Sequence, residues 1–563
     1  MTAEVTNASA TDRLGEVARH GLPLLVPGII LVMVLLLIIG PMAAMLLEAF
    51  VSENSSLERI VTPLIKPAYW EALLNTIVIS VGTAVLATVI GTVLAWVLVR
   101  TDTVGGPILE KVCQIPIFVP PFIGAIAWTL LAAPNMGIIN KTLAMLGTDF
   151  TFDVYTLPGM IWVIGLYLAP YVMLIVSAAL RSMDPSLEEA AQISGMSKIK
   201  TAMRITAPVL APSIASGMGI AFAISLGLFG TPMVLGWSRQ ILTLTGRIYM
   251  ASQEFPAAYD LMAVCSIYLL LLSSVAVFMQ KRFLGDRKFI TVTGKAFRPR
   301  KIELGAVRWA TFSLAILFIV VTIVAPVAVL VAASISTFTW SGIYDVSLLS
   351  QRLLNTDVIQ STTNSLRLAV WAASFSVGLA ILLSWIFVRT QTRGCGLLEY
   401  IVLTPISIPG ITFGVGVFLM WIYLPLPVYG TSLIIIFAFI GQFTAYAVRS
   451  IMASLAQIHP ELEESARLCG YGPVRTFLSV TAPLIMPSMV ASWVLVFSFC
   501  MIELSMVLLL YTSENRTLSV LVFEVWQVGD FSYLATVSLL QVTIGMVFMT
   551  ISKIVTRNSG MRT

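Results

Sequence analysis

Long apolar runs joined by short polar connections take up most of this sequence. In helical form, about 20 predominantly apolar residues cross the hydrocarbon core of a bilayer, and runs of that length favour membrane-spanning helices. About twelve such runs occur, near residues 23–47, 73–99, 112–134, 157–180, 206–234, 261–280, 309–334, 366–388, 397–423, 430–452, 481–511 and 532–552. The sequence therefore predicts an all-α, polytopic membrane protein.

The composition agrees with a chain that lies mostly in a membrane. Of the 563 residues, 58% are hydrophobic and 11% are charged, whereas soluble domains carry about 25% charged residues. Twelve spans use most of this length, which excludes a large fused soluble enzyme. The five cysteines, at positions 113, 265, 395, 469 and 500, form no CxxC pair, and the histidines are His20 and His459. These positions predict neither a disulfide framework nor a metal-ligand cluster.

Lysine and arginine are distributed unequally between the connections. If the amino terminus is cytoplasmic, 25 of the 33 Lys and Arg residues fall in inside segments and eight in outside segments. Basic residues gather on the cytoplasmic side of membrane proteins, so this bias predicts both termini in the cytoplasm. It also explains the net charge of +5 without a nucleic-acid partner. The first apolar run is too long for a signal peptide, and we interpret it as an uncleaved span.

The chain contains an internal repeat. The segment WVLVRT at 96–101 recurs as WIFVRT at 385–390, an offset of 289 positions. Four other pairs keep this offset: Asn75 with Asn364, Glu110 with Glu399, Pro116 with Pro405 and Pro120 with Pro409. Farther along, the offset is 275, in Pro185 with Pro460, Glu189 with Glu464, Gly195 with Gly470 and Pro208 with Pro483. The second copy is therefore 14 residues shorter between its third and fourth spans, which predicts an external loop at 135–155 in the first copy.

Each copy of the repeat holds six spans, an even number. The two copies therefore share one orientation, are related by an axis along the membrane normal, and can enclose a path between them. We divide the chain into a cytoplasmic segment at 1–21, a first repeat at 22–281, a cytoplasmic linker at 282–308 and a second repeat at 309–563. Nine Lys or Arg residues at 281–308 suit a linker held at the anionic inner leaflet.

A short polar helix is predicted between the fourth and fifth spans of each copy. Asp184 can cap this helix, and Pro185 suits its first position. Glu188 and Glu189 lie at the positive end of the helix dipole, and Gly195 suits a left-handed end. The second copy repeats these signals in Pro460, Glu463, Glu464 and Gly470. Small side chains form one face of each helix, suited to a groove on another protein: Leu187, Ala190, Ala191 and Ser194, and Leu462, Ser465, Ala466 and Cys469.

These motifs resemble the signature of the binding-protein-dependent ABC importer permeases. The first copy reads EAA at 189–191, then Gly195, then ITAP at 205–208, and the second reads ESA at 464–466, then Gly470, then VTAP at 480–483. Ser465 and Val480 depart mildly from the pattern. The resemblance implies the type I ABC importer permease fold, with two parallel six-helix repeats. It also implies that each short helix docks on a separate ATPase subunit, of which two copies would match the two helices.

The resemblance assigns ATPase coupling to residues of both short helices: Leu187, Glu188, Glu189, Ala190, Ala191 and Gly195, and Leu462, Glu463, Glu464, Ala466 and Gly470. ATP and magnesium are expected on the partner, because a phosphate-binding loop needs G-x-x-x-x-G-K-[ST]. The nearest candidate here, Gly294-Lys295, lacks the upstream glycine and precedes Ala296. We therefore expect a transport subunit without catalytic residues, metal ligands or a cofactor of its own.

Three residues are candidates for the translocation path. Glu503 is an ionisable group in an apolar run, where a charge is costly. It either lines the path or occupies a solvated helix end, because a straight helix from Thr481 would carry it about 33 Å, to the outer interface. Phe229 and Gly230 begin the matching segment FGTP at 229–232, which is either a break within a helix or the end of a span.

The fused twelve-span arrangement, with FGTP and the later TLTGRIY at 243–249, resembles the ferric-iron importer permeases. This implies import of ferric iron from a periplasmic binding protein across the bacterial inner membrane. Thiamine, phosphonates and polyamines are alternative substrates within the class. An ion-coupled secondary transporter is an alternative class, but it should carry paired ionisable groups in its spans. A membrane enzyme should carry a cluster of reactive side chains near one leaflet, and the sequence offers neither.

Overall fold

The computed structural model describes residues 28, 31–51, 63, 65–184, 186–284, 301–337, 343–389 and 394–559. Every named element within these ranges is helical, and isolated β-bridges join Thr101 to Ile302 and Ser336 to Tyr344. The prediction of an all-α protein is confirmed. The predicted segment 1–21 and most of the predicted linker 282–308 lie outside the described residues.

The first half of the chain contains η1 (Leu35–Ile39), α3 (Gly40–Val51), α5 (Pro67–Arg100), α6 (Gly106–Cys113), η2 (Ile115–Phe118), α7 (Pro121–Ala132), α8 (Ile138–Met145), α9 (Leu157–Ser182), α10 (Ser186–Ile193), α11 (Lys198–Thr201), η3 (Ala202–Thr206), α12 (Ala207–Gly227), α13 (Gly230–Gly236), η4 (Trp237–Arg239), α14 (Leu244–Gln253) and α15 (Tyr259–Leu284). The symbol η marks π-helical or 3-10 turns.

The second half contains η5 (Gly305–Val307), α16 (Arg308–Ile319), η6 (Val320–Val324), α17 (Ala325–Ser334), α18 (Ser347–Leu353), α19 (Thr356–Arg389), α20 (Cys395–Leu403), η7 (Thr404–Ser407), α21 (Gly410–Tyr423), α22 (Ser432–Leu455), α23 (Glu461–Leu468), α24 (Pro473–Thr476), η8 (Phe477–Thr481), α25 (Ala482–Ile502), η9 (Val507–Leu509), α26 (Leu518–Val528) and α27 (Phe531–Ser559).

Among the described residues, ten helices are long and apolar enough to span a membrane, and two bent helix pairs bring the number to twelve. The bent pairs are the third spans of the two halves. The chain turns by 98° between Gly106–Phe118 and Pro121–Ala132, and by 113° between Cys395–Ser407 and Gly410–Tyr423. The count of about twelve spans is confirmed, but the uninterrupted spans predicted at 112–134 and 397–423 are wrong.

Proline causes both bends. Val119 and Ile408 precede Pro120 and Pro409, and both have extended backbone conformations, with ψ of 121° and 126°. A residue before proline avoids the helical region, and proline itself has no N–H to donate. The break therefore recurs at the same place in both halves because the prolines recur at an offset of 289.

The predicted fifth spans, 206–234 and 481–511, are longer than the helices that form. The straight helices α12 and α25 end at Gly227 and Ile502. The remaining apolar residues fold into the short elements α13 and η9. Both halves leave the helix at the same place, since Leu228 and Glu503 are extended and 275 positions apart.

Matching contacts confirm the repeat in three dimensions. In each half the long second span packs on the fourth, α5 on α9 and α19 on α22. The repeated asparagines also have the same role. Asn75 Nδ2 donates to the carbonyl of Leu242 at 3.1 Å, and Asn364 Nδ2 donates to the carbonyl of Arg516 at 3.2 Å. Each amide therefore holds the segment before α14 or α26 against the second span.

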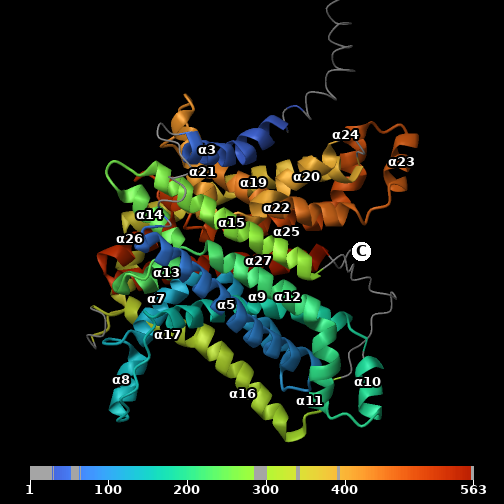
Figure 1. The fold of residues 1–563 in the computed structure, drawn as a ribbon. Helices are drawn as coiled ribbons and strands as arrows, with labels where there is room; N and C mark the ends of the chain where they lie inside the picture. The colour runs from blue at the N-terminus through green and yellow to red at the C-terminus, as the bar shows by residue number, and fades with distance from the viewer. Residues whose placement is uncertain are drawn as a thin grey trace, which may run out of the picture.

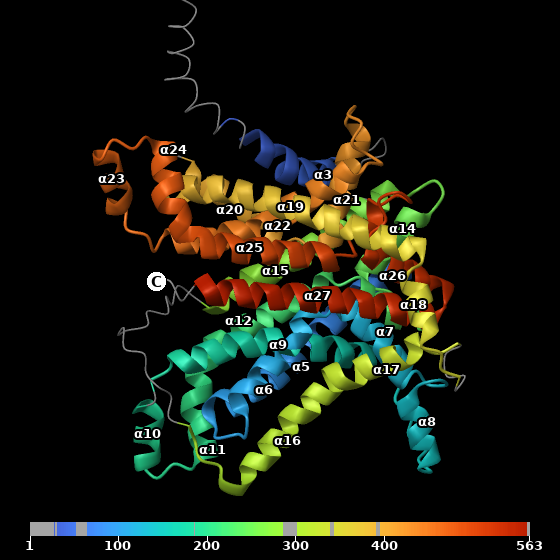
Figure 2. The ribbon, with the colours of Figure 1, turned by 180° about the vertical axis from the view of Figure 1, so that it is seen from behind.

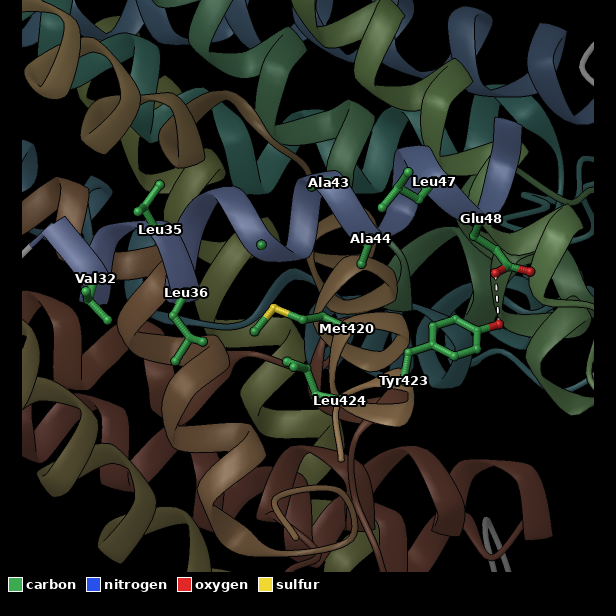
Figure 3. Close-up of a pocket in the computed structure, with 11 residues that line it drawn as sticks. Val32, Leu35, Leu36, Ala43, Ala44, Leu47, Glu48, Met420, Tyr423 and Leu424 are labelled. Carbon is green, nitrogen blue, oxygen red and sulfur yellow. Dashed lines mark hydrogen bonds between the residues drawn. The ribbon is translucent and has the colours of Figure 1, made fainter. Parts of the chain in front are cut away.

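The first span of each half packs against the other half. Helix α3 lies on α21, and α17 lies on α7 (Figures 1 and 2). Backbones approach closely here, because a Cβ added at Gly416 would lie 2.4 Å from the carbonyl oxygen of Pro41. Figure 3 shows the edge of this contact, an apolar cavity of about 740 Å³ lined in part by Leu36 and Met420. At one end of the cavity the Tyr423 hydroxyl donates to Glu48, so the halves are also joined by a hydrogen bond of 2.9 Å.

Helices α10 and α23, which we call the docking helices, lie at the same end of the molecule and far apart from one another (Figures 1 and 2). Helices α14 and α26 lie together at the opposite end, which we call the far end. The spans run between these two ends. The structure thus separates a docking end from an end where the halves meet.

We expect Gly91→Leu to destabilise the protein, because an added Cβ would lie 2.5 Å from the carbonyl oxygen of Ala169 and 2.8 Å from the Cβ of Val172. Overpacking of this kind costs about 1–3 kcal/mol. Thermal denaturation of the purified chain in detergent measures the effect. The control is Gly378→Leu in α19, since a Cβ there meets nothing within 4 Å. An equal melting temperature for the two variants would contradict the predicted contact between α5 and α9.

Candidate functional site

The docking helices begin and end largely as the sequence predicts. The backbone N–H of Ser186 donates to Asp184 Oδ1 at 2.9 Å, so Asp184 caps the first turn of α10. Gly195 and Gly470 follow the two helices with φ of +84° and +82°. A Cβ at either glycine would meet nothing within 4 Å. Backbone conformation, and not lack of space, is therefore the reason for glycine at these two positions.

A buried carboxylate fixes each docking helix to the spans. Glu188 Oε2 of α10 lies 3.1 Å from Arg100 Nη2 at the end of α5. Its second oxygen, Oε1, accepts a hydrogen bond of 2.6 Å from the Thr206 hydroxyl, directly before α12. The Arg100 side chain is 0% exposed and that of Glu188 is 6% exposed. One carboxylate therefore joins the docking helix to the second and fifth spans of the first half.

The second half repeats this arrangement with the same residue types. Glu463 Oε1 of α23 lies 3.2 Å from Arg389 Nε and accepts a hydrogen bond of 3.0 Å from the Thr481 hydroxyl. Arg389 Nη2 also donates to the carbonyl of Ile458 at 3.0 Å, just before the docking helix. We call each set a docking triad: Arg100, Glu188 and Thr206 in the first half, and Arg389, Glu463 and Thr481 in the second.

Sequence reasoning placed the two glutamates on these helices but missed their partners. The arginines are the fifth residues of the repeated WVLVRT and WIFVRT segments, and the threonines lie in ITAP and VTAP. In the sequence, the arginines stand out only as part of the repeat and the threonines only as part of the signature. The available signal was chemical: an arginine ends a span in both copies, and such a charge needs a partner when it is buried.

The outward face of the docking helices differs from the predicted small-residue face. Ala191 and Ala466 are buried together with the triad glutamates, so they face the protein. Among the large apolar side chains of these helices, the most exposed are Ile193, at 88%, and Leu468, at 90%, which occupy equivalent positions in the repeat. The other described members of the predicted faces are exposed: Ala190, Ser194, Leu462, Ser465 and Cys469. Glu464 is also exposed, whereas the side chains of Leu187 and Glu189 lie outside the described residues.

The chain that leads into α16 contacts the end of α5 next to the first triad. Beside the first triad, the backbone N–H of Ile302 donates to the carbonyl of Arg100 at 2.7 Å, and Asp102 N–H donates to the carbonyl of Ile302 at 3.1 Å. The Asp102 carboxylate then accepts from the N–H of Leu304 at 2.8 Å. The chain that enters α16 is thus attached beside the first triad. The segment matching 101–104 in the second half, 390–393, lies outside the described residues.

Aromatic side chains from both halves meet at the far end. Phe229 lies 5.3 Å from Tyr249 and 5.4 Å from Phe523, measured between ring centroids, and Tyr249 lies 5.6 Å from Phe523. Gly230 allows a close approach there, because an added Cβ would lie 2.7 Å from Phe122 Cβ and 3.0 Å from Leu504 Cδ2. The predicted path residues Phe229 and Gly230 therefore lie where the two halves contact one another.

Glu503 lies at the end of α25 and bonds locally. Its Oε1 accepts from the Ser505 hydroxyl at 2.6 Å and from the backbone N–H of Met506 at 3.0 Å. A Cβ added at Gly410, the first residue of α21, would lie 3.1 Å from the same oxygen. The carboxylate caps the turn that follows the span, so it is partly buried and hydrogen-bonded and is not a solvated helix end.

A second ionisable cluster at the far end escaped the sequence analysis. Arg516 Nη1 lies 3.1 Å from Glu524 Oε2, and its Nη2 lies 2.7 Å from Asp357 Oδ1. Burial and the neighbouring Glu524 carboxylate raise the pKa of Tyr511. Three residues after Glu524, Gln527 Nε2 donates to the hydroxyl of Tyr249 in the other half at 3.1 Å. Among the described residues, no group of three or more His, Cys, Asp or Glu side chains could hold a metal ion.

The chain belongs to the family described as the binding-protein-dependent transport system inner membrane component, whose model matches residues 88–287 and 391–562. It is therefore an ABC importer permease with two fused halves, and it resembles the ferric permeases. The putative ferric transport system permease FbpB 1 of Haemophilus influenzae is 24% identical over 86% of this chain and 78% of its own length. FbpB of Actinobacillus pleuropneumoniae is 25% identical over 89% and 74%.

Other matches cover about half of the chain. The sulfate transport system permease CysT of Escherichia coli is 27% identical over 46% of this chain and 91% of its own length. A solved bacterial ABC transporter involved in alginate import aligns with 49% of this chain and 100% of its own, at 21% identity and a TM-score of 0.40.

Loss of Arg389 should release the second docking helix. Removing one partner of a buried ion pair leaves an uncompensated charge and costs about 3–5 kcal/mol. In a chain that carries a nitroxide label at position 468 of α23, we expect Arg389→Ala to increase the mobility of the label in electron paramagnetic resonance spectra. The control is Arg449→Ala, which removes an exposed arginine from α22. Unchanged mobility in the Arg389 variant would contradict the role of the triad.

Replacing Gly470 should separate transport from membrane insertion. Valine at φ of +82° is strained, at a cost of about 1–2 kcal/mol or more. We expect Gly470→Val to distort the end of α23 and abolish uptake while the amount of protein in the membrane stays unchanged. Gly472→Val is a close control, because Gly472 has φ of −68° and open space around its Cβ. Normal uptake by a well-expressed Gly195→Val, Gly470→Val double variant would exclude a coupling role.

Proposed function

We propose that this chain forms the membrane path of an ATP-driven importer that takes ferric iron from a periplasmic binding protein. ATP and magnesium bind to a separate ATPase, two copies of which engage the two docking helices. Both termini and both docking helices are cytoplasmic in this arrangement, and the far end faces the periplasm. The observation that carries the proposal is the pair of docking triads, since each one attaches an exposed helix to two spans through a buried carboxylate.

The triads suggest how closure of the ATPase reaches the spans. The docking helices lie far apart (Figure 1), and an ATPase pair that closes on ATP draws them together. Glu188 and Glu463 pass this displacement to α5 and α12, and to α19 and α25, because a buried carboxylate does not readily leave its partners. Ile193 and Leu468 are the exposed apolar side chains that enter the groove on the ATPase.

The same displacement then changes the contact between the halves at the far end. Helices α12 and α25 both end beside this contact, at Gly227 and Ile502. Phe229 and Tyr249 belong to the first half and Phe523 to the second, so rotation of the halves separates these rings. Separation opens the path toward the binding protein. Rings in contact, as here, keep this end closed while the docking helices are apart.

Ferric iron is the cargo that the relatives support best. The two FbpB proteins cover more than four fifths of this chain, and their names specify ferric transport. No cargo-binding group of this chain is needed to select iron, because selection falls to the binding protein in such a system. Thiamine, phosphonates and polyamines remain the competing substrates, and each calls for a different binding protein.

Purification of the tagged chain from native membranes tests the class and the substrate together. We expect an ATPase subunit to copurify and its ATP hydrolysis in proteoliposomes to rise when the iron-loaded binding protein is added. The same binding protein without iron serves as the control, and thiamine, a phosphonate and a polyamine are tested as competing ligands. Uptake of another ligand would contradict iron as the cargo but would still agree with an ABC importer. A chain that purifies alone and transports without ATP would be a secondary transporter.

A further inference from the structure

Helix α8 is a feature of the first half alone. It lies in the segment 133–156 between α7 and α9, whereas the second half joins α21 to α22 with the shorter segment 424–431. Figures 1 and 2 both show α8 at the far end, lying across the direction of the spans and projecting sideways beyond α17. A helix placed in this way runs along the membrane surface and away from the contact between the halves.

Hydrogen bonds hold the base of α8 firmly. The Asn140 side chain is 5% exposed, and its Nδ2 donates to the carbonyls of Ala133 and Phe152 at 3.0 and 2.8 Å. Its Oδ1 accepts from the backbone N–H of Phe152 at 2.8 Å. A Cβ added at Gly137 would lie 2.7 Å from the Cα of Ala132, so the chain turns closely against the end of α7. The hydrogen bonds of Asn140 and the close turn at Gly137 therefore fix the direction of α8 relative to α7.

The outward face of α8 carries large apolar side chains, with the polar Lys141 and Thr142 on the same side. Met145 and Leu146 are 86% and 73% exposed, and Ile138, seven positions before Met145, lies on the same face. Between them, the Thr142 hydroxyl donates to the carbonyl of Ile138 at 2.8 Å, which satisfies its polar atom within the helix. Phe150 follows the helix and is 66% exposed. In water this surface would cost about 25 cal/mol for each Å² of apolar area.

We propose that α8 is an interfacial helix that inserts Ile138, Met145 and Leu146 into the lipid leaflet at the far end. A helix of eight residues is marginal in water, and short amphipathic helices with large apolar side chains lie in the bilayer interface. The exposed Lys141 lies at the edge of the apolar face, from which a long side chain reaches the lipid headgroups. The proposal rests only on the membrane location of the chain and not on its cargo.

A protein partner fits these observations less well. A binding protein that delivers cargo must reach the contact between Phe229 and Phe523, where the halves meet. Helix α8 points away from that contact and past the outer side of α17 (Figure 2). Lipid surrounds the spans at this position. The bilayer is therefore the surface that this face meets without any rearrangement.

Site-directed fluorescence in lipid nanodiscs tests the proposal on the full chain. Cys395 and Cys469, the cysteines that are not buried, are first replaced by serine, and Ser194 shows that serine suits the position matching Cys469. Separate Met145→Cys and Leu146→Cys variants then carry an environment-sensitive dye, and Ala144→Cys, an exposed position of the same helix outside the apolar face, is the matched control. The quencher is a phospholipid with a nitroxide on its acyl chain close to the headgroup.

We expect blue-shifted emission at positions 145 and 146, with quenching by the nitroxide lipid at least twofold stronger than at position 144. Water-like emission at all three positions, with equally weak quenching, would overturn the proposal. Dye at position 145 that becomes shielded only after the binding protein is added would also overturn it, in favour of a protein contact. Two apolar-face positions keep the test valid if one variant fails to fold.

Discussion

The buried carboxylate of each docking triad is the interaction on which the rest of the arrangement depends. Glu188 and Glu463 can be buried because each carboxylate has an arginine guanidinium and a threonine hydroxyl as partners. An apolar contact could slide as the spans tilt. A carboxylate that leaves these partners would be buried and uncompensated, so the docking helix and the spans move together. In the proposed importer, displacement of the two short helices would therefore reach the far-end contact through the spans.

The two halves share the docking triad but differ in other parts. The Arg516–Glu524 pair belongs to the second half, and α8 belongs to the first. A fused chain permits such differences, because each half always meets the same partner and is free to specialise.

Several features of the fold could be predicted from the sequence. The span count, the repeat and both docking helices follow from local patterns of apolar residues, prolines and glycines. The bends in the third spans had a visible signal in Pro120, Pro121 and Pro409, yet a hydropathy reading treats a bent span and a straight one alike. Ala191 was assigned to the wrong face because helical periodicity gives relative angles within a helix and not the direction of the protein.

The sequence by itself determined that this chain is helical, crosses the membrane about twelve times, repeats itself and presents two docking helices. The spans and the two short helices depend on runs of adjacent residues, and the repeat follows from comparing two parts of the same sequence. Only the tertiary structure decided that Arg100 meets Glu188, that Phe229 meets Phe523 and that each first span lies on the other half. Such contacts join residues far apart in the sequence. They depend on how whole helices pack, which no local pattern records.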